Sequence, residues 1–130
     1  MSANTFTFIT QDGVEIVARR WAPDQVQPKA VVQIAHGMAE HIQRYDNFAR
    51  HLVKHHFAVY GNDHRGHGLT GQKMGIAGYF ADEDGFDRVV GDIEQKRSLC
   101  RYCQLAGRTA CAEQQLRQRV FCFYDIILEH

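Results

Sequence analysis

Two short apolar runs, Ala30–Ala35 and Phe57–Tyr60, flank a segment with helical periodicity, and this order constrains the fold more than any other feature of the sequence. The helical segment, Tyr45–His56, repeats apolar residues at positions i, i+3, i+4, i+7 and i+8, which is typical of an amphipathic helix. Two consecutive parallel strands need such a crossover, because a tight turn cannot return the chain in the same direction. The sequence therefore predicts a strand–helix–strand unit at the start of a doubly wound α/β sheet.

A β-hairpin is predicted before this unit. Residues 5–10 and 14–21 alternate apolar and polar side chains, and Asp12-Gly13 lies between them. Asp-Gly is a strong hairpin signal because glycine adopts a positive φ at little cost. Further along, the glycine-rich stretch Gly66–Gly78 is predicted to be a loop, and a second helix is predicted to begin at Gly85. The fold class expected from these elements is α/β.

The length of 130 residues fits one small domain, and the charge balance argues against several kinds of partner. Fifteen Lys and Arg residues face fifteen Asp and Glu residues, so there is no basic excess for nucleic acid or an anionic membrane surface. The N-terminus lacks a signal-peptide pattern. No apolar run approaches the roughly 20 residues that span a bilayer. We therefore expect a cytoplasmic protein with no nucleic-acid partner and no transmembrane segment.

Both predicted parallel strands end in segments that could carry chemistry, His36-Gly37-Met38 and Asp63–Gly68. Ligands of α/β sheets bind at the carboxyl ends of such strands. Gly37 would let the chain turn sharply and leave the N–H of Met38 free to donate. An N–H of this kind can stabilise the oxyanion of an acyl-transfer reaction by roughly 3 kcal/mol. The alternative is an ordinary strand-to-loop turn, which a bare His-Gly dipeptide favours.

A longer sequence match favours the interpretation of the Met38 N–H as an oxyanion donor. The segment His36-Gly-Met-Ala-Glu-His41, then Arg44-Tyr45, then Gly61-Asn-Asp63-His-Arg65-Gly-His67-Gly68, resembles the monoacylglycerol lipase and lysophospholipase branch of the α/β-hydrolases. This branch is also called serine aminopeptidase-like. The resemblance covers about residues 5–95. It implies hydrolysis of carboxylic esters, such as those of lipids, through a serine acyl-enzyme and without a cofactor.

The resemblance also implies roles for individual residues. Met38 would supply a backbone N–H of the oxyanion hole, and His36 and Gly37 would shape its loop. A second group would form a structural loop under the active site: Asp63, Arg65, Gly66, His67 and Gly68. Thr70 stands where the family usually carries serine and keeps the hydroxyl.

The nucleophile of such an enzyme is missing from the sequence. The only serines are Ser2 and Ser98, and neither lies in a Gly-x-Ser-x-Gly motif. Residues 96–130 match neither the nucleophile segment nor the catalytic Asp and His that the family carries after it. We therefore divide the chain into residues 1–95, the N-terminal part of an α/β-hydrolase domain, and residues 96–130, a divergent tail.

Two hypotheses follow for the whole chain. The first is a truncated serine hydrolase that is inactive alone, and the second is a non-catalytic binding module that keeps the substrate-side scaffold. A shifted reading frame or gene truncation would explain the tail, because all four cysteines lie beyond residue 96; a genuine replacement of the segment is the alternative. Loss of the nucleophile strand would leave an open sheet edge at Val31–Ala35 that favours self-association. Val120–Tyr124 could instead occupy this edge, because a helix from Gly85 into the tail could return the chain in the right-handed sense.

Metal binding is not expected. His64-x-x-His67 and Cys100-x-x-Cys103 are each half of a possible zinc site, but Cys111 and Cys122 do not form the second close pair that such sites usually show. The Cys-x-x-Cys segment also lacks the preceding strand of a redox motif. We therefore assign no metal and no cofactor to the chain.

Overall fold

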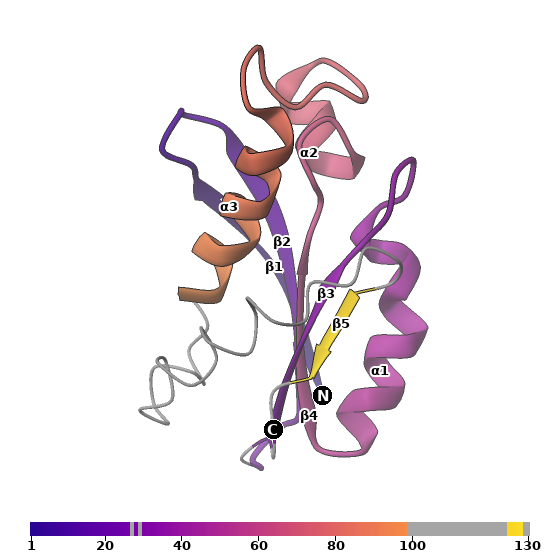
Figure 1. Cartoon of the computed structure of the whole chain (residues 1–130). Helices are drawn as coiled ribbons and strands as arrows, with labels where there is room; N and C mark the ends of the chain where they lie inside the picture. The colour runs from indigo at the N-terminus through magenta and orange to yellow at the C-terminus, as the bar shows by residue number, and fades with distance from the viewer. Residues whose placement is uncertain (27, 29, 99–124, 129–130) are drawn as a thin grey trace.

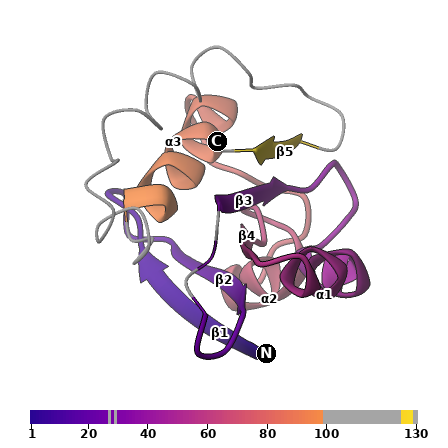
Figure 2. The same ribbon diagram turned by 90° about the horizontal axis from the view of Figure 1, so that it is seen from below.

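A computed structural model of the chain shows a mixed β-sheet with helices on both faces (Figures 1 and 2). The structure describes residues 1–26, 28, 30–98 and 125–128. Within these residues the sheet has five strands in the order β1-β2-β4-β3-β5. The strands are β1 (Ser2–Ile9), β2 (Glu15–Ala22), β3 (Ala30–Ala35), β4 (Phe57–Asn62) and β5 (Asp125–Leu128).

The predicted hairpin is confirmed. β1 and β2 pair antiparallel from Ser2 opposite Ala22 to Ile9 opposite Glu15. Gly13 in the connecting turn has a φ of 86°, a conformation that glycine adopts without steric cost. The turn is closed by the Thr10 hydroxyl, which donates to Asp12 at 2.7 Å and accepts the Val14 N–H at 3.0 Å. β2 then pairs antiparallel with β4, so the hairpin forms one side of the sheet.

The predicted strand–helix–strand unit is also confirmed. β3 and β4 are parallel, and α1 (Asp46–Lys54), preceded by the 3-10 turn η1 (Ile42–Tyr45), connects them. The apolar face of α1 packs on the sheet through Ala49 and Val53. Together with residues of the sheet they form the main buried cluster, whose other members are Trp21, Val32, Ile34, Ile42 and Val59.

A second helix, α3 (Gly85–Ser98), begins where it was predicted and covers the face of the sheet opposite α1 (Figure 2). Each face of the sheet therefore carries a helix, as the α/β class requires. None of the helices in the described part of the chain has the length and apolar character needed to cross a bilayer.

The prediction of a loop over Gly66–Gly78 is wrong for its central part, because Gly68–Met74 forms the helix α2. Two features that glycine content does not reveal stabilise this helix. The carboxylate of Asp63, five residues upstream, accepts the Leu69 N–H in the first turn at 3.0 Å. At the other end Gly75 terminates the helix with a φ of 78°.

The expected open edge beside β3 is wrong over most of its length, because β5 pairs there. Val32–Ala35 lie opposite Leu128–Asp125 in antiparallel register. The segment predicted to pair there, Val120–Tyr124, lies outside the described residues. The strand that follows it runs antiparallel to β3, whereas a right-handed crossover from α3 would have given a parallel strand. Self-association through an uncovered β3 edge therefore loses its structural basis.

Candidate functional site

The loops that follow β3 and β4 meet at one end of the sheet, as their parallel pairing requires. His36 and His64 connect them through two hydrogen bonds. The His64 N–H donates to Nε2 of His36 at 3.0 Å, and Nε2 of His64 donates to the His36 carbonyl at 2.8 Å. The ring centres of the two histidines lie 4.0 Å apart. The structure therefore brings together the two segments that the sequence singled out.

The hydrogen bonds of His36 define its protonation state. Its Nε2 accepts a backbone N–H, so that nitrogen carries no proton. Its Nδ1 donates to the Gly37 carbonyl at 2.8 Å. The side chain is only 4% exposed, and burial lowers the pKa of His36 below its ordinary value. His36 is therefore a neutral imidazole that fixes the backbone on both sides of the site.

Acidification is expected to destabilise the fold through His36. Because its folded pKa lies below the unfolded value of about 6.5, the unfolded chain takes up the proton first as the pH falls, and stability is lost. The loss has a limiting slope of about 1.4 kcal/mol per pH unit. Urea unfolding between pH 7.5 and 5.5 measures this slope. His36→Gln should be less stable at pH 7.5 and should give a flatter profile; an unchanged slope would show that another group is responsible.

Glu40 organises the loop that contains Met38. Its Oε2 accepts the Gly37 N–H and the Tyr45 hydroxyl, each at 2.9 Å, and its Oε1 pairs with Arg44 at 3.1 Å. The bond from Gly37 is the main reason that the pKa of Glu40 is lowered, followed by the bond from Tyr45. Sequence reasoning quoted Glu40 in the motif but gave it no role, because its contacts to Gly37 and Tyr45 depend on how the loop folds.

Met38 lies at the exposed tip of this loop, with 72% of its surface accessible. The Gly37 N–H is already bonded to Glu40. In the part of the chain that the structure describes, the Met38 N–H donates to no acceptor. The turn is completed by Ala39 with a φ of 57°. Of the two adjacent amides, the Met38 N–H, to which the resemblance gave the oxyanion role, is the one without an acceptor among the described residues.

Asp63 fixes the base of both loops and is 2% exposed. Its carboxylate accepts the Ile42 N–H at 2.8 Å and the Leu69 N–H at 3.0 Å, so one side chain holds η1 and α2 in place. A Cβ at Gly68 would lie 2.5 Å from this carboxylate, which explains the glycine. The Thr70 hydroxyl donates to the Asp63 carbonyl at 2.8 Å and accepts the Val17 N–H at 2.9 Å.

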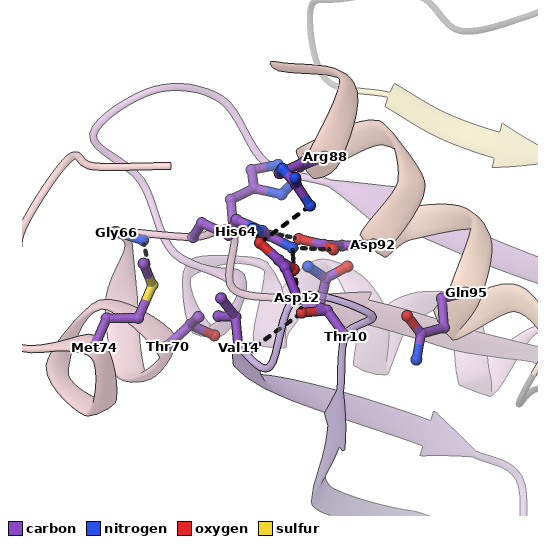
Figure 3. A network of polar contacts seen from close by, with 12 residues as sticks. Thr10, Asp12, Val14, His64, Gly66, Thr70, Met74, Arg88, Asp92 and Gln95 are labelled. Carbon is purple, nitrogen blue, oxygen red and sulfur yellow. Dashed lines mark hydrogen bonds and ion pairs between the residues drawn. The ribbon is translucent and has the colours of Figure 1, made fainter. Parts of the chain in front are cut away.

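Arg65 is the centre of a buried ionic network that sequence reasoning did not find; Figure 3 labels its acidic partners Asp12 and Asp92. Arg65 is 1% exposed. Its guanidinium donates to Asp92 of α3 at 2.7 and 2.9 Å, and to Asp12 of the hairpin turn at 2.5 and 2.6 Å. Arg88 adds a longer contact to Asp12 at 3.3 Å. Neither Asp12 nor Asp92 is near Arg65 in sequence, so only the fold reveals the pairing.

The pKa values of the two carboxylates in this network are shifted in opposite directions. The hydrogen bonds from Arg65 are the main cause that lowers the pKa of Asp12, whose side chain is 25% exposed. Burial raises the pKa of Asp92, whose side chain is 4% exposed, and it outweighs the opposing effect of Arg65. The hydrogen bonds from Asp12, and then those from Asp92, raise the pKa of Arg65. The arginine is therefore a permanent cation, and Asp92 is the partner that depends most on it.

Gly66 and His67 complete the loop. Gly66 has a φ of 71°, and its carbonyl accepts the Gly78 N–H at 2.7 Å. Nδ1 of His67 donates to the Arg65 carbonyl at 2.8 Å, and its ring packs against Phe80 with centres 5.8 Å apart. These contacts fasten the segment before α3 to the end of β4. They suit a structural function for the loop under the site.

In the described part of the chain, no hydrogen bond or ion pair places either serine beside the Met38 loop. Ser2 begins β1 opposite Ala22, at the end of the sheet away from His36, and Ser98 ends α3. A cavity of about 210 Å³ borders Asp63 and Ile42 rather than Met38. No group of three or more His, Cys, Asp or Glu side chains within the described ranges could hold a metal ion.

The sheet order, the crossover helix and the loops at the strand ends define the first part of an α/β-hydrolase fold. A carboxyl esterase from Bacillus coagulans, solved with glycerol, has this fold: the TM-score is 0.58 at 24% identity, over 75% of this chain and 34% of the esterase. The chain belongs to the family described as serine aminopeptidase, S33, whose family model matches residues 26–102.

Two relatives show what share of a related protein this chain covers. A monoacylglycerol lipase of Mycolicibacterium smegmatis is 45% identical over 67 residues, which are 52% of this chain and 24% of the lipase. Protein K6 of Vaccinia virus (strain Western Reserve) is 38% identical over 77 residues, which are 58% of this chain and 88% of Protein K6. The chain thus spans about a quarter of the length of the lipase but nearly all of Protein K6.

Proposed function

We propose that these 130 residues form the oxyanion-loop part of a carboxylic-ester hydrolase of the monoacylglycerol lipase type and do not hydrolyse esters by themselves. The observation that carries the proposal is the difference between two adjacent backbone amides, those of Gly37 and Met38. The Glu40 carboxylate accepts a hydrogen bond from the Gly37 N–H at 2.9 Å, and the Met38 N–H is available to donate to a ligand. The family of the chain and the name of the mycobacterial lipase support an ester as that ligand.

The chemistry explains why this part alone is insufficient. Attack on an ester carbonyl places negative charge on its oxygen, and a preorganised N–H such as that of Met38 would stabilise this charge by roughly 3 kcal/mol. The bond to the carbonyl carbon must come from a nucleophile, and loss of a catalytic serine lowers turnover on the order of a millionfold. Ser2 lies at the opposite end of the sheet from Met38, and Ser98 is the last residue of α3. The oxyanion loop therefore has nothing to stabilise until a nucleophile is supplied.

A non-catalytic binding module is the second candidate. Protein K6 favours it, because 88% of that relative's length matches this chain. The loop is also fixed by residues of this part itself: Glu40, Tyr45 and Asp63. In this case the loop would bind an ester without cleaving it.

The purified chain is expected not to hydrolyse p-nitrophenyl butyrate above the buffer rate and not to react with a fluorophosphonate probe. A complete monoacylglycerol lipase serves as the positive control in both assays. Hydrolysis that disappears in a Ser98→Ala variant would overturn the proposal.

The Met38 amide resonance, followed during titration with a non-hydrolysable monoalkylglycerol ether, separates the two candidates: a saturable shift at micromolar ligand supports the binding module, and no shift supports the incomplete hydrolase.

A further inference from the structure

Two histidines lie four residues apart at the end of α1: His51 in its last turns and His55 at its C-cap. His51 and His55 are both exposed, whereas the buried residues of the helix, Ala49 and Val53, point to the sheet. The two imidazole rings lie with their centres 4.8 Å apart and their planes inclined by 58°. Neither residue contacts the loops after β3 and β4 in any hydrogen bond or ring contact described above. The pair is therefore separate from the candidate ester site.

The spacing of these rings suits a shared metal ion. A metal–nitrogen bond of about 2.1 Å places the ring centre roughly 3.2 Å from the ion. Two imidazoles at angles between 90° and 109° would then have their centres about 4.5 to 5.2 Å apart. The observed 4.8 Å lies within this interval. We propose that His51 and His55 chelate a late first-row divalent ion, of the class Ni²⁺, Cu²⁺ or Zn²⁺.

The surroundings of the pair determine the kind of site. No third His, Cys, Asp or Glu side chain among the described residues joins the two histidines, so water fills the remaining coordination positions. Imidazole donors select these ions over Mg²⁺ and Ca²⁺, which prefer oxygen. Two cations share the exposed side of the helix: Arg50, whose charge is paired with Asp46 at 2.7 Å, and Lys54. The site is an open, exchangeable one rather than a closed structural centre.

The experiment uses the full chain after its cysteines have been blocked with iodoacetamide, because four thiols would otherwise compete for the ion. Substoichiometric Ni²⁺ is added at pH 7.5, and paramagnetic broadening is followed in a ¹⁵N–¹H correlation spectrum. The variants are His51→Ala and His55→Ala. Both should fold, since each removes an exposed side chain and His51, the one within α1, is replaced by the strongest helix former. The matched control is His56→Asn, which removes the neighbouring exposed histidine and suits its φ of 68°.

The wild-type chain and His56→Asn should lose amide signals first over residues 50–56. Either alanine variant should need at least roughly 10-fold more Ni²⁺ for the same broadening, because the second bond of a chelate is intramolecular. Mg²⁺ at the same concentration should change nothing in these signals. Equal broadening in the wild type and both alanine variants, a larger loss in His56→Asn, or broadening centred on another histidine would each overturn the proposal.

Discussion

Replacement of Arg65 by methionine is expected to lower the free energy of unfolding by about 3–5 kcal/mol, because it leaves a buried carboxylate without its counter-charge. Asp92 is the group affected most, since its side chain is 4% exposed and accepts two hydrogen bonds from Arg65. A small domain is stable by only about 5–15 kcal/mol. The substitution therefore removes a large part of the stability and is measured by urea denaturation at pH 7.5.

Two further variants show whether the buried charge is the cause. Lys73→Met removes a cation from an exposed pair with Glu15 at 3.4 Å and should cost at most about 1 kcal/mol. The double variant Arg65→Met/Asp92→Leu replaces both buried partners with apolar groups and should recover much of the loss. If the double variant were less stable than Arg65→Met, the explanation by an unpaired carboxylate would fail.

Replacement of Gly66 by alanine is expected to destabilise the fold by roughly 2–5 kcal/mol, the sum of the costs of a positive φ and of a steric clash. The φ of Gly66 is 71°, which a residue with a Cβ adopts at a cost of about 1–2 kcal/mol. A Cβ at this position would lie 2.4 Å from the backbone nitrogen of Tyr79. Because that neighbour is backbone, it cannot rotate away, and the contact between the β4 loop and the segment before α3 must open.

Gly75 provides a control that separates the cost of the positive φ from the cost of the steric clash. Its φ is 78°, close to that of Gly66, but a Cβ there would meet no atom within 4 Å. Gly75→Ala should therefore cost only the backbone term, about 1–2 kcal/mol. Thermal or urea unfolding of both variants gives the difference, which measures the clash alone. Equal losses in the two variants would show that the approach of Tyr79 is unimportant.

The elements that could be predicted from sequence are those coded by local patterns. Asp12-Gly13 between alternating runs gave the hairpin, and the helical repeat of Tyr45–His56 gave the crossover. The short helix α2 was missed because its first turn is capped by Asp63, a residue outside it. Glycine density was an unreliable guide there, since Gly75 terminates a helix and Gly68 makes room for a carboxylate.

The site was accessible to sequence reasoning only in part. Position at a strand end identified His36 and Asp63, because parallel strands bring their carboxyl ends together. The residues that hold these loops in place could not be found in this way. Glu40 acts through a bond to Gly37 whose geometry depends on the folded loop. Asp92 is an ordinary acidic residue of a helix until the fold places it 2.7 Å from Arg65.

The Arg65 network has a consequence for the order of folding events. Its two ion pairs join residues that are 53 and 27 positions apart in the chain, so each closes a long loop. Loop closure is entropically unfavourable until neighbouring structure has formed, and the pairs require both the hairpin turn and α3 to be in place. The network is therefore expected to form after the rate-limiting step of folding. The network should then lower mainly the unfolding rate. Arg65 would therefore determine the lifetime of the native state rather than the folding rate.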